Sequence, residues 1–285
     1  MAHPHRTPEN LTIQPRDLAF GRQAPSARWW AGGDPVATAF YNALSATFPL
    51  GERFFMDSVR RYRNVAPTEL KTQIAAFLAQ EAMHTREHIF FNNQIADHGY
   101  DIAKMEARTR EKLEFARSRP PLQQLGATIA LEHFTAILAH ALLADPRHLD
   151  GAPDEAKAMW RWHAIEEIEH KAVAFDTYVL AAAALPAWRR WSLRAMTMVA
   201  ATQLLFAVVG ANMADLFEAD GIRNGRTWRR VLDFLLVRPG MLRQVLGAYF
   251  TYFLPGFHPW RHDDRALVRE AELSLETAYA QGATA

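Results

Sequence analysis

The 285-residue chain contains no cysteine. Disulfide bonds, zinc–thiolate sites and iron–sulfur clusters are therefore excluded, and the redox compartment is left undetermined. Any bound metal must be held by Glu, Asp and His side chains, which suits iron, manganese or zinc. The formal net charge is only +1 and the basic residues are spread along the chain, which gives no reason to expect nucleic-acid binding.

Residues 1–28 lack the apolar segment of a secretory signal and are instead polar and proline-containing. We expect them to form an N-terminal arm that is either disordered or extended over the rest of the chain, and we expect a cytoplasmic protein. Hydrophobic residues make up 49% of the sequence, which is enough for a substantial core.

The sequence also lacks any clear period-two alternation, so it predicts no sheet and an all-α fold. Proline and glycine divide it into helical segments, and we expect residues 29–185 to form a metal-binding four-helix bundle. Residues 186–285 are expected to add apolar helices packed on that bundle, within the same domain. The main helices are predicted at residues 35–48, 52–63, 68–97, 122–143 and 153–184.

The most informative motif is a pair of Glu-x-x-His sequences, each preceded by a lone glutamate about thirty residues upstream. Residues three apart on a helix share a face, so both side chains of each pair can point into one site. The surrounding helix stripes are apolar or small, and buried carboxylates there are very costly unless cations compensate them. The sequence therefore predicts two metal ions between four helices, with the ligands Glu52, Glu81, His84, Glu132, Glu167 and His170.

Two more histidines fall on the same helix faces. His163 precedes Glu167 by four residues, and we expect it to be a seventh ligand; the alternative is a histidine that packs or hydrogen-bonds a ligand. His88 lies one turn beyond His84. Ligation, hydrogen bonding to a ligand and core packing are all open for His88, and the sequence favours hydrogen bonding to a ligand.

Two acidic residues lie near the second motif. Glu166 is one position off the ligand face, so we expect it to stand behind the ligands or in solvent. Asp176 lies six residues beyond His170, and we expect it to accept a hydrogen bond from a ligand histidine on a neighbouring helix, because metal-bound imidazoles usually need an acceptor. No catalytic residue beyond the metal ligands is identified.

The ordered set of glutamates and histidines resembles the ferritin-like di-iron carboxylate superfamily. With His163 added, the His-x-x-x-Glu-x-x-His motif is similar to that of the arylamine N-oxygenases. The wider sequence, over roughly residues 30–265, resembles a bacterial family known as predicted metal-dependent hydrolases. The segments that carry this second resemblance are Phe48-Pro49, Gly51 through Phe55, His163 through Lys171, and Gly256 through Trp260.

The residue set and the resemblance favour a ferritin-like non-haem di-iron oxidase or oxygenase. Two iron ions would be its cofactor, with manganese–iron, manganese or zinc as alternatives, and its partners would be O₂, a small apolar or aromatic substrate and an external electron donor. The alternative function is a metal-dependent hydrolase that activates water at the same dinuclear site. A non-catalytic iron-handling protein is a third interpretation, which the additional hundred C-terminal residues disfavour.

Residues 195–214 form a stretch of twenty without a charged side chain, just long enough to span a bilayer. Polar residues within this stretch lower its hydrophobicity, so we expect a helix packed against the bundle. Peripheral membrane contact through residues 188–214 is the alternative, and the apolar helical surface is compatible with a homodimer.

Overall fold

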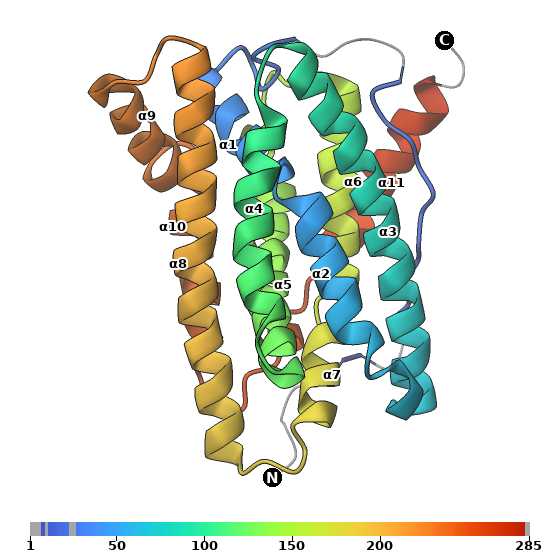
Figure 1. Ribbon diagram of the computed structural model, residues 1–285. Coiled ribbons are helices and arrows are strands. Elements are labelled where there is room, and N and C mark those ends of the chain that lie inside the picture. The colour runs from blue at the N-terminus through green and yellow to red at the C-terminus, as the bar shows by residue number, and fades with distance from the viewer. Residues whose placement is uncertain (1–6, 9–10, 23–26, 283–285) are drawn as a thin grey trace.

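The computed structural model describes residues 7–8, 11–22 and 27–282 of the chain. Within these residues all regular structure is helical and no β-strand occurs, which confirms the predicted all-α fold class. Figure 1 shows the long helices standing side by side along one common direction. In chain order, the elements are α1 (Pro35–Ser45), α2 (Phe48–Arg60), η1 (Arg63–Val65), α3 (Thr68–Asp97), α4 (Ile102–Arg117), α5 (Pro121–Ala144), η2 (Pro146–Leu149), α6 (Asp154–His170), α7 (Val173–Ala181), α8 (Ala187–Ala219), α9 (Gly225–Leu236), α10 (Met241–Thr251), η3 (Pro259–Arg261) and α11 (Arg265–Gly282).

Prolines and capping side chains explain the first helix boundaries. Asp34 precedes Pro35, and its carboxylate accepts a hydrogen bond from the Val36 backbone N–H at 2.7 Å, which satisfies a free donor of the first turn of α1. Pro49 was expected to interrupt a helix, but it lies in the first turn of α2, where a missing N–H costs nothing. The site glutamate Glu52 consequently sits near the start of α2.

Helices α2, α3, α5 and α6 pack against one another around the buried centre of the molecule. The predicted continuous helix over 153–184 is instead two helices, because residues 171–172 form a turn between α6 and α7. Lys171 in this turn is buried, and its Nζ donates to Asp264 Oδ2 at 2.5 Å and to the His262 carbonyl at 2.8 Å. These contacts link the turn directly after His170 to the C-terminal part of the chain.

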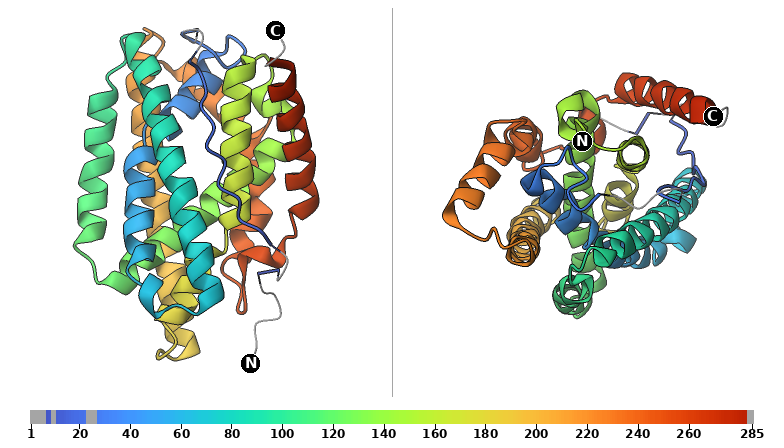
Figure 2. Two further views of the ribbon diagram at one scale, coloured as in Figure 1. Left: turned by 90° about the vertical axis from the view of Figure 1, so that its right-hand side faces the viewer. Right: turned by 90° about the horizontal axis from the view of Figure 1, so that it is seen from above.

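The N-terminal residues 11–22 contain no helix and run along the outside of the molecule beside α3, α6 and α11 (Figure 2). Glutamates of the helices hold this segment: Glu166 Oε1 accepts from the Arg16 N–H at 2.9 Å, and Glu87 Oε2 accepts from the Phe20 N–H at 3.0 Å. The other parts of the predicted arm, residues 1–6, 9–10 and 23–26, lie outside the described residues. The division of the chain at residues 28 and 185 stays a prediction.

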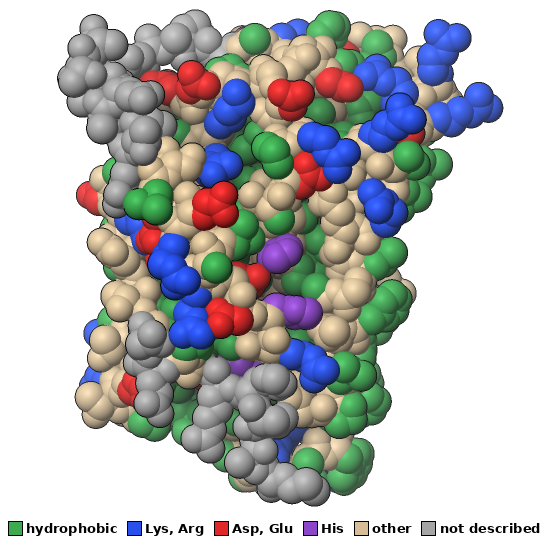
Figure 3. Space-filling model, turned by 180° about the vertical axis from the view of Figure 1, so that it is seen from behind, with side chains coloured by type: hydrophobic (Ala, Val, Ile, Leu, Met, Phe, Trp, Pro, Cys, Tyr) green, Lys and Arg blue, Asp and Glu red, His purple; other side chains and the backbone are tan. Residues whose placement is uncertain are grey.

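Among the described residues, two helices are by length and composition apolar enough to cross a membrane, and they differ in burial. In its most apolar window α5 is 67% buried, as befits a core helix, whereas α8 is only 28% buried. Large apolar side chains of α8, among them Trp188, Met196 and Phe206, are exposed. Figure 3 shows hydrophobic side chains gathered along the right-hand edge, the side on which α8 lies when seen from behind. Membrane contact through residues 188–214 stays a prediction.

Candidate metal centre

Four helices bring the six predicted ligands together in the interior. Every one of these side chains is at most 4% exposed, although all six are ionisable. The lone glutamates come from α2 and α5, while each Glu-x-x-His pair lies on one face of α3 or α6. The residues concerned are Glu52 on α2, Glu81 and His84 on α3, Glu132 on α5, and Glu167 and His170 on α6.

The ligand atoms form two overlapping triads. In one triad, atoms of Glu52, Glu81 and His84 all lie within 4.8 Å of one another; in the other, the same holds for Glu81, Glu132 and His170. Opposite ligands of one ion lie about 4.2 Å apart when each bond is about 2.1 Å long, so the 4.8 Å limit of each triad is slightly wider than a single-ion site with a metal bound. Glu81 belongs to both triads and is therefore placed to bridge two ions.

Glu167 lies between the two triads. Its Oε1 is 3.5 Å from His84 Nδ1 and 3.6 Å from His170 Nε2, so one carboxylate oxygen faces the ligand nitrogens of both histidines. Glu167 is therefore placed, like Glu81, where it could contribute to either ion of a dinuclear site. The four helices thus supply four carboxylates and two imidazoles to one volume, as the sequence predicts.

The hydrogen-bonding of these side chains tests whether they fit metal ions. Eight of their buried oxygen and nitrogen atoms have no hydrogen-bond partner, which is costly for polar atoms removed from water. All eight belong to the two triads and Glu167, and metal coordination would satisfy them. The atoms are Glu52 Oε1, both carboxylate oxygens of Glu81, His84 Nδ1, both carboxylate oxygens of Glu132, Glu167 Oε2 and His170 Nε2.

The electrostatics of the carboxylates agree with this interpretation. Burial, and next the charge of Glu81, hold the pKa of Glu52 and of Glu132 well above that of an ordinary carboxyl group. Burial likewise raises the pKa of Glu81. The cluster therefore favours its protonated form unless positive charge is supplied, and two divalent cations would supply it.

The pKa values of the two imidazoles also indicate that positive charge is favoured at this centre. Burial acts to lower the pKa of His84, but hydrogen bonds to Glu166 and Glu167 outweigh burial and raise it to about 10. Burial also opposes protonation of His170, yet the charge of Glu167 raises the pKa of His170 well above its ordinary value. A metal ion at each nitrogen would replace these protons.

Hydrogen bonds behind the centre select the nitrogen that each histidine presents. His84 Nε2 lies 3.0 Å from Glu166 Oε2, which leaves Nδ1 directed at the carboxylates. His170 is held through Nδ1, 2.9 Å from Gln80 Oε1, which leaves Nε2 for the site. Acceptors of this kind orient metal-bound imidazoles and raise their basicity. The structure therefore places Glu166 behind the ligands, one of the two positions expected for it.

The support for His170 extends to the N-terminal segment. Gln80 Nε2 donates to Glu169 Oε2 at 2.8 Å, and Arg16 NH2 donates to Glu169 Oε1 at 2.6 Å. Arg16 also pairs with Glu272 of α11. Neither Gln80 nor Arg16 was predicted, since Gln80 is separated from His170 by 90 residues and Arg16 from Glu169 by 153 residues. No local pattern in the sequence signals either contact.

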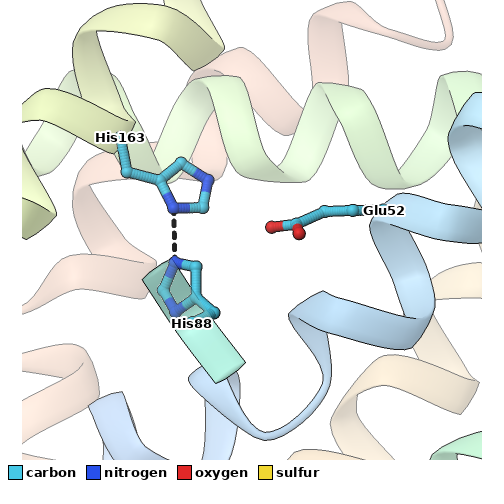
Figure 4. Close-up of side chains that lie close together, drawn as sticks. All are labelled: Glu52, His88 and His163. Carbon is cyan, nitrogen blue, oxygen red and sulfur yellow. Dashed lines mark hydrogen bonds between the residues drawn. The ribbon is translucent and has the colours of Figure 1, made fainter. Parts of the chain in front are cut away.

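His163 and His88 adjoin the centre on one side. His163 Nε2 lies 2.9 Å from Glu167 Oε1, and its Nδ1 lies 2.6 Å from His88 Nε2 (Figure 4). Atoms of His163 also come within 4.8 Å of His84 and Glu167 and, separately, of Glu52 and His88. Ligation by His163 stays a prediction. His88 hydrogen-bonds His163 and, through Nδ1, Ser45 Oγ at 2.8 Å, and its expected role behind a ligand stays a prediction.

Asp176 requires a correction. It was expected to accept a hydrogen bond from a ligand histidine, but its partners are Thr7 Oγ1 at 2.7 Å and His258 Nε2 at 3.1 Å. The turn at residues 171–172 separates α7 from the helix that carries His170, so spacing along one continuous helix no longer applies. Asp176 instead connects the N-terminal segment with the loop before η3.

Neither a curated protein sequence nor a solved structure shows significant similarity to this chain, so the ferritin-like character of the bundle stays a prediction. A family model described as "Predicted metal-dependent hydrolase" matches residues 14–263, which include every candidate ligand. This match confirms the resemblance noted from the sequence. It supports metal dependence and the hydrolase alternative better than the oxygenase. By this match, the chain belongs to the family of predicted metal-dependent hydrolases.

Proposed function

We propose that this protein is a dinuclear metal-dependent enzyme of the hydrolase class. The observation that carries the proposal is the convergence of eight buried, unpartnered ligand atoms from four helices. If these side chains served only to stabilise the fold, so many ionisable groups would not be needed in the interior, because well-packed apolar residues cost less free energy to bury. The family description supports hydrolysis as the reaction.

In this proposal Glu52 and His84 would hold one ion, Glu132 and His170 would hold the other, and Glu81 would contribute to both. Two such ions, when bound, polarise a carbonyl or phosphoryl oxygen and lower the pKa of water. The chain contributes a buried setting, in which electrostatic interactions are stronger than in water. It also contributes the hydrogen bonds that hold the two imidazoles in orientation.

His163 is suited to either of two roles. It completes the spacing of a third triad with His84 and Glu167, which supports its predicted role as a seventh ligand. It also lines a small cavity beside Glu167, and burial lowers its pKa to about 4, so its imidazole is neutral at pH 7 and can contact a reactant held there without adding charge.

Oxidation by O₂ at two iron ions is a second candidate function, favoured by the donor set. One glutamate from each of two helices and a Glu-x-x-His pair from each of two others is the ligand pattern of di-iron carboxylate bundles. Under this proposal the protein would also need an external electron donor. Iron would then be the cofactor, and the substrate would be small and apolar.

Metal content of the purified protein is the first test. The proposal expects about two ions per chain, loss of metal in Glu81→Ala and Glu167→Ala, and full retention in Glu69→Ala, a control at an exposed position of α3. Full retention of metal in both site variants would overturn the dinuclear assignment.

Reaction class is tested on reconstituted protein. Hydrolysis of model esters and phosphoesters under anaerobic conditions with zinc or manganese would support the hydrolase. Stoichiometric O₂ uptake after Fe(II) loading, together with no anaerobic hydrolysis, would reject the hydrolase in favour of oxidation.

A further inference from the structure

A large apolar cavity lies beside the metal centre. It has a volume of about 490 Å³ and is bounded by residues of α2, α4, α5 and α8. Its walls are chiefly aliphatic and aromatic, as at Phe54, Leu131 and Leu205. Phe115 and Met196, which are 60% and 63% exposed, also line it, so the cavity reaches the surface between α4 and α8 (Figure 1).

The cavity is long as well as large. Residues of α5 line it from Gln123 to Leu138, a span of fifteen residues, which corresponds to about 22 Å along a helix. These dimensions suit one unbranched chain better than a compact ring system.

The only charged side chains among the described lining residues are two cations at the end where α4 passes into α5. Lys112 is 39% exposed and pairs with the solvent-facing Glu111 at 2.7 Å. Arg119 lies 5.3 Å from the ring centroid of Phe115 and is exposed. Both cations can therefore contact an anion at the mouth, and no carboxylate among the lining residues would repel it.

The opposite end of the cavity leads to the metal centre. A second cavity of about 50 Å³ shares the lining residues Leu44, Phe48, Thr135 and Leu138 with the first, and its wall also includes His163 and Glu167. The Phe48 ring lies 5.1 Å from the His163 ring. An occupant of the large cavity that extends past Phe48 therefore meets the centre with its inner end.

We propose that this cavity binds a single-chain amphiphile with an anionic head group, the head at Lys112 and Arg119 and the chain directed inward past Phe48. The inference rests on the proposed function only for the statement that a bond that water can cleave, such as an ester or amide carried at the inner end of the chain, lies near His163 and Glu167. The apolar surface beside the mouth, at Phe115 and Met196, favours entry of such a molecule from a micelle or bilayer.

Calorimetric titration of the purified, metal-containing protein tests the proposal. Decanoate and decyl phosphate provide carboxylate and phosphate heads, while decanol and decyltrimethylammonium provide neutral and cationic heads on the same chain. We expect one anionic ligand to bind per chain, at least tenfold tighter than the cationic one. Comparison of the two anions identifies the preferred head group, and binding of either supports the proposal. Equal affinity for all four compounds would overturn it.

Variants separate the two ends of the site. Lys112→Glu with Arg119→Glu should weaken decanoate binding at least tenfold and leave decanol binding unchanged. Arg53→Glu with Arg110→Glu, which changes the net charge equally on exposed positions of α2 and α4, should change neither. Ala127→Trp, at the cavity wall, should weaken binding of both compounds. Retention of decanoate affinity in the Lys112 and Arg119 double variant would reject the head-group site.

Binding can be tested independently of catalysis. Glu81→Ala removes a proposed metal ligand but no wall of the large cavity, so its decanoate affinity should equal that of the native protein. If metal binding is disproved while this affinity persists, the proposed function fails and the binding site stands. If the metal is present but decanoate does not bind to the native protein, the present inference fails alone.

Discussion

His84 and Glu166 lie 3.0 Å apart through Nε2 and Oε2, and this contact turns the other imidazole nitrogen toward the carboxylates of the centre. Both side chains are fully buried, and Oε1 of the same glutamate accepts the backbone N–H of Arg16. Glu166 therefore connects a candidate ligand with the segment that runs over the outside of the bundle.

Glu166→Ala should lower metal affinity by about 10- to 100-fold, since His84 loses the acceptor that orients it. Glu166→Gln, which keeps one acceptor oxygen, should recover part of the loss. Competition with a chelator of known affinity measures both effects, with Glu69→Ala as the control. Native affinity in Glu166→Ala would show that the contact does not support the ligand.

Arg16→Ala should destabilise the protein by about 2–3 kcal/mol, because it leaves the nearly buried Glu169 without its cationic partner. Chemical unfolding measures this loss. The matched control is Arg60→Ala, which removes an exposed pair with Asp57 and should change the free energy of unfolding by about 0.5 kcal/mol or less. Equal effects of the two substitutions would contradict a structural role for the N-terminal segment.

The metal-free protein should lose stability as pH rises from about 7.5 to 9, above the range in which the histidines with lowered pKa, such as His163, change the stability. The folded-state pKa of Glu52 and of Glu132 lies well above the unfolded value near 4.5, so the folded state binds more protons and deprotonation penalises it. The raised pKa of His84, about 10, acts in the same sense. Protonated His84 stabilises the folded state fully below pH 6.5, and this stabilisation is lost as pH approaches 10. Glu167 has a lowered pKa, so its contribution is constant in this range.

Metal should reverse this dependence, because deprotonated ligands bind cations more tightly. The difference in Tm between metal-loaded and chelator-treated protein should therefore grow from about pH 7.5 to pH 9. Scanning calorimetry in matched buffers measures it. A difference that shrinks with rising pH would contradict coordination by these residues.

Glu132→Leu should stabilise the metal-free protein while removing one of the two ion sites. The carboxylate is 1% exposed and neither of its oxygens has a hydrogen-bond partner, so an apolar side chain of similar size should gain about 1–4 kcal/mol. Unfolding of chelator-treated protein and metal analysis report the two effects separately. A less stable metal-free variant would show that Glu132 is needed for packing rather than for metal.

His163→Ala should retain metal and change the visible spectrum of cobalt-substituted protein, because its Nε2 lies at the edge of the centre beside Glu167. His88→Ala provides the comparison, since His88 contacts His163 and should change the spectrum less. An identical spectrum in His163→Ala and native protein would exclude ligation by His163.

Helix periodicity explains why most of the centre could be predicted. The pairs Glu81–His84 and Glu167–His170 depend only on a three-residue spacing along one helix, and the apolar stripes around them indicate burial. The tertiary contacts of Gln80, Arg16 and Asp176 depend on how distant segments meet. The turn after His170 also escaped prediction, because Lys171 and Ala172 carry no helix-breaking signal.

The residue order alone determined an all-helical chain and the six side chains that converge on the candidate centre, since both follow from local spacing and from the cost of burying unpaired carboxylates. Tertiary packing alone decided which nitrogen of each histidine faces the carboxylates and where the N-terminal segment is held. It also decided that a long apolar cavity shares part of its wall with a small cavity lined by His163. Hydrogen-bond partners up to 256 residues apart and the spaces between helices are set by how side chains of the whole chain fill the interior, and no local pattern encodes them.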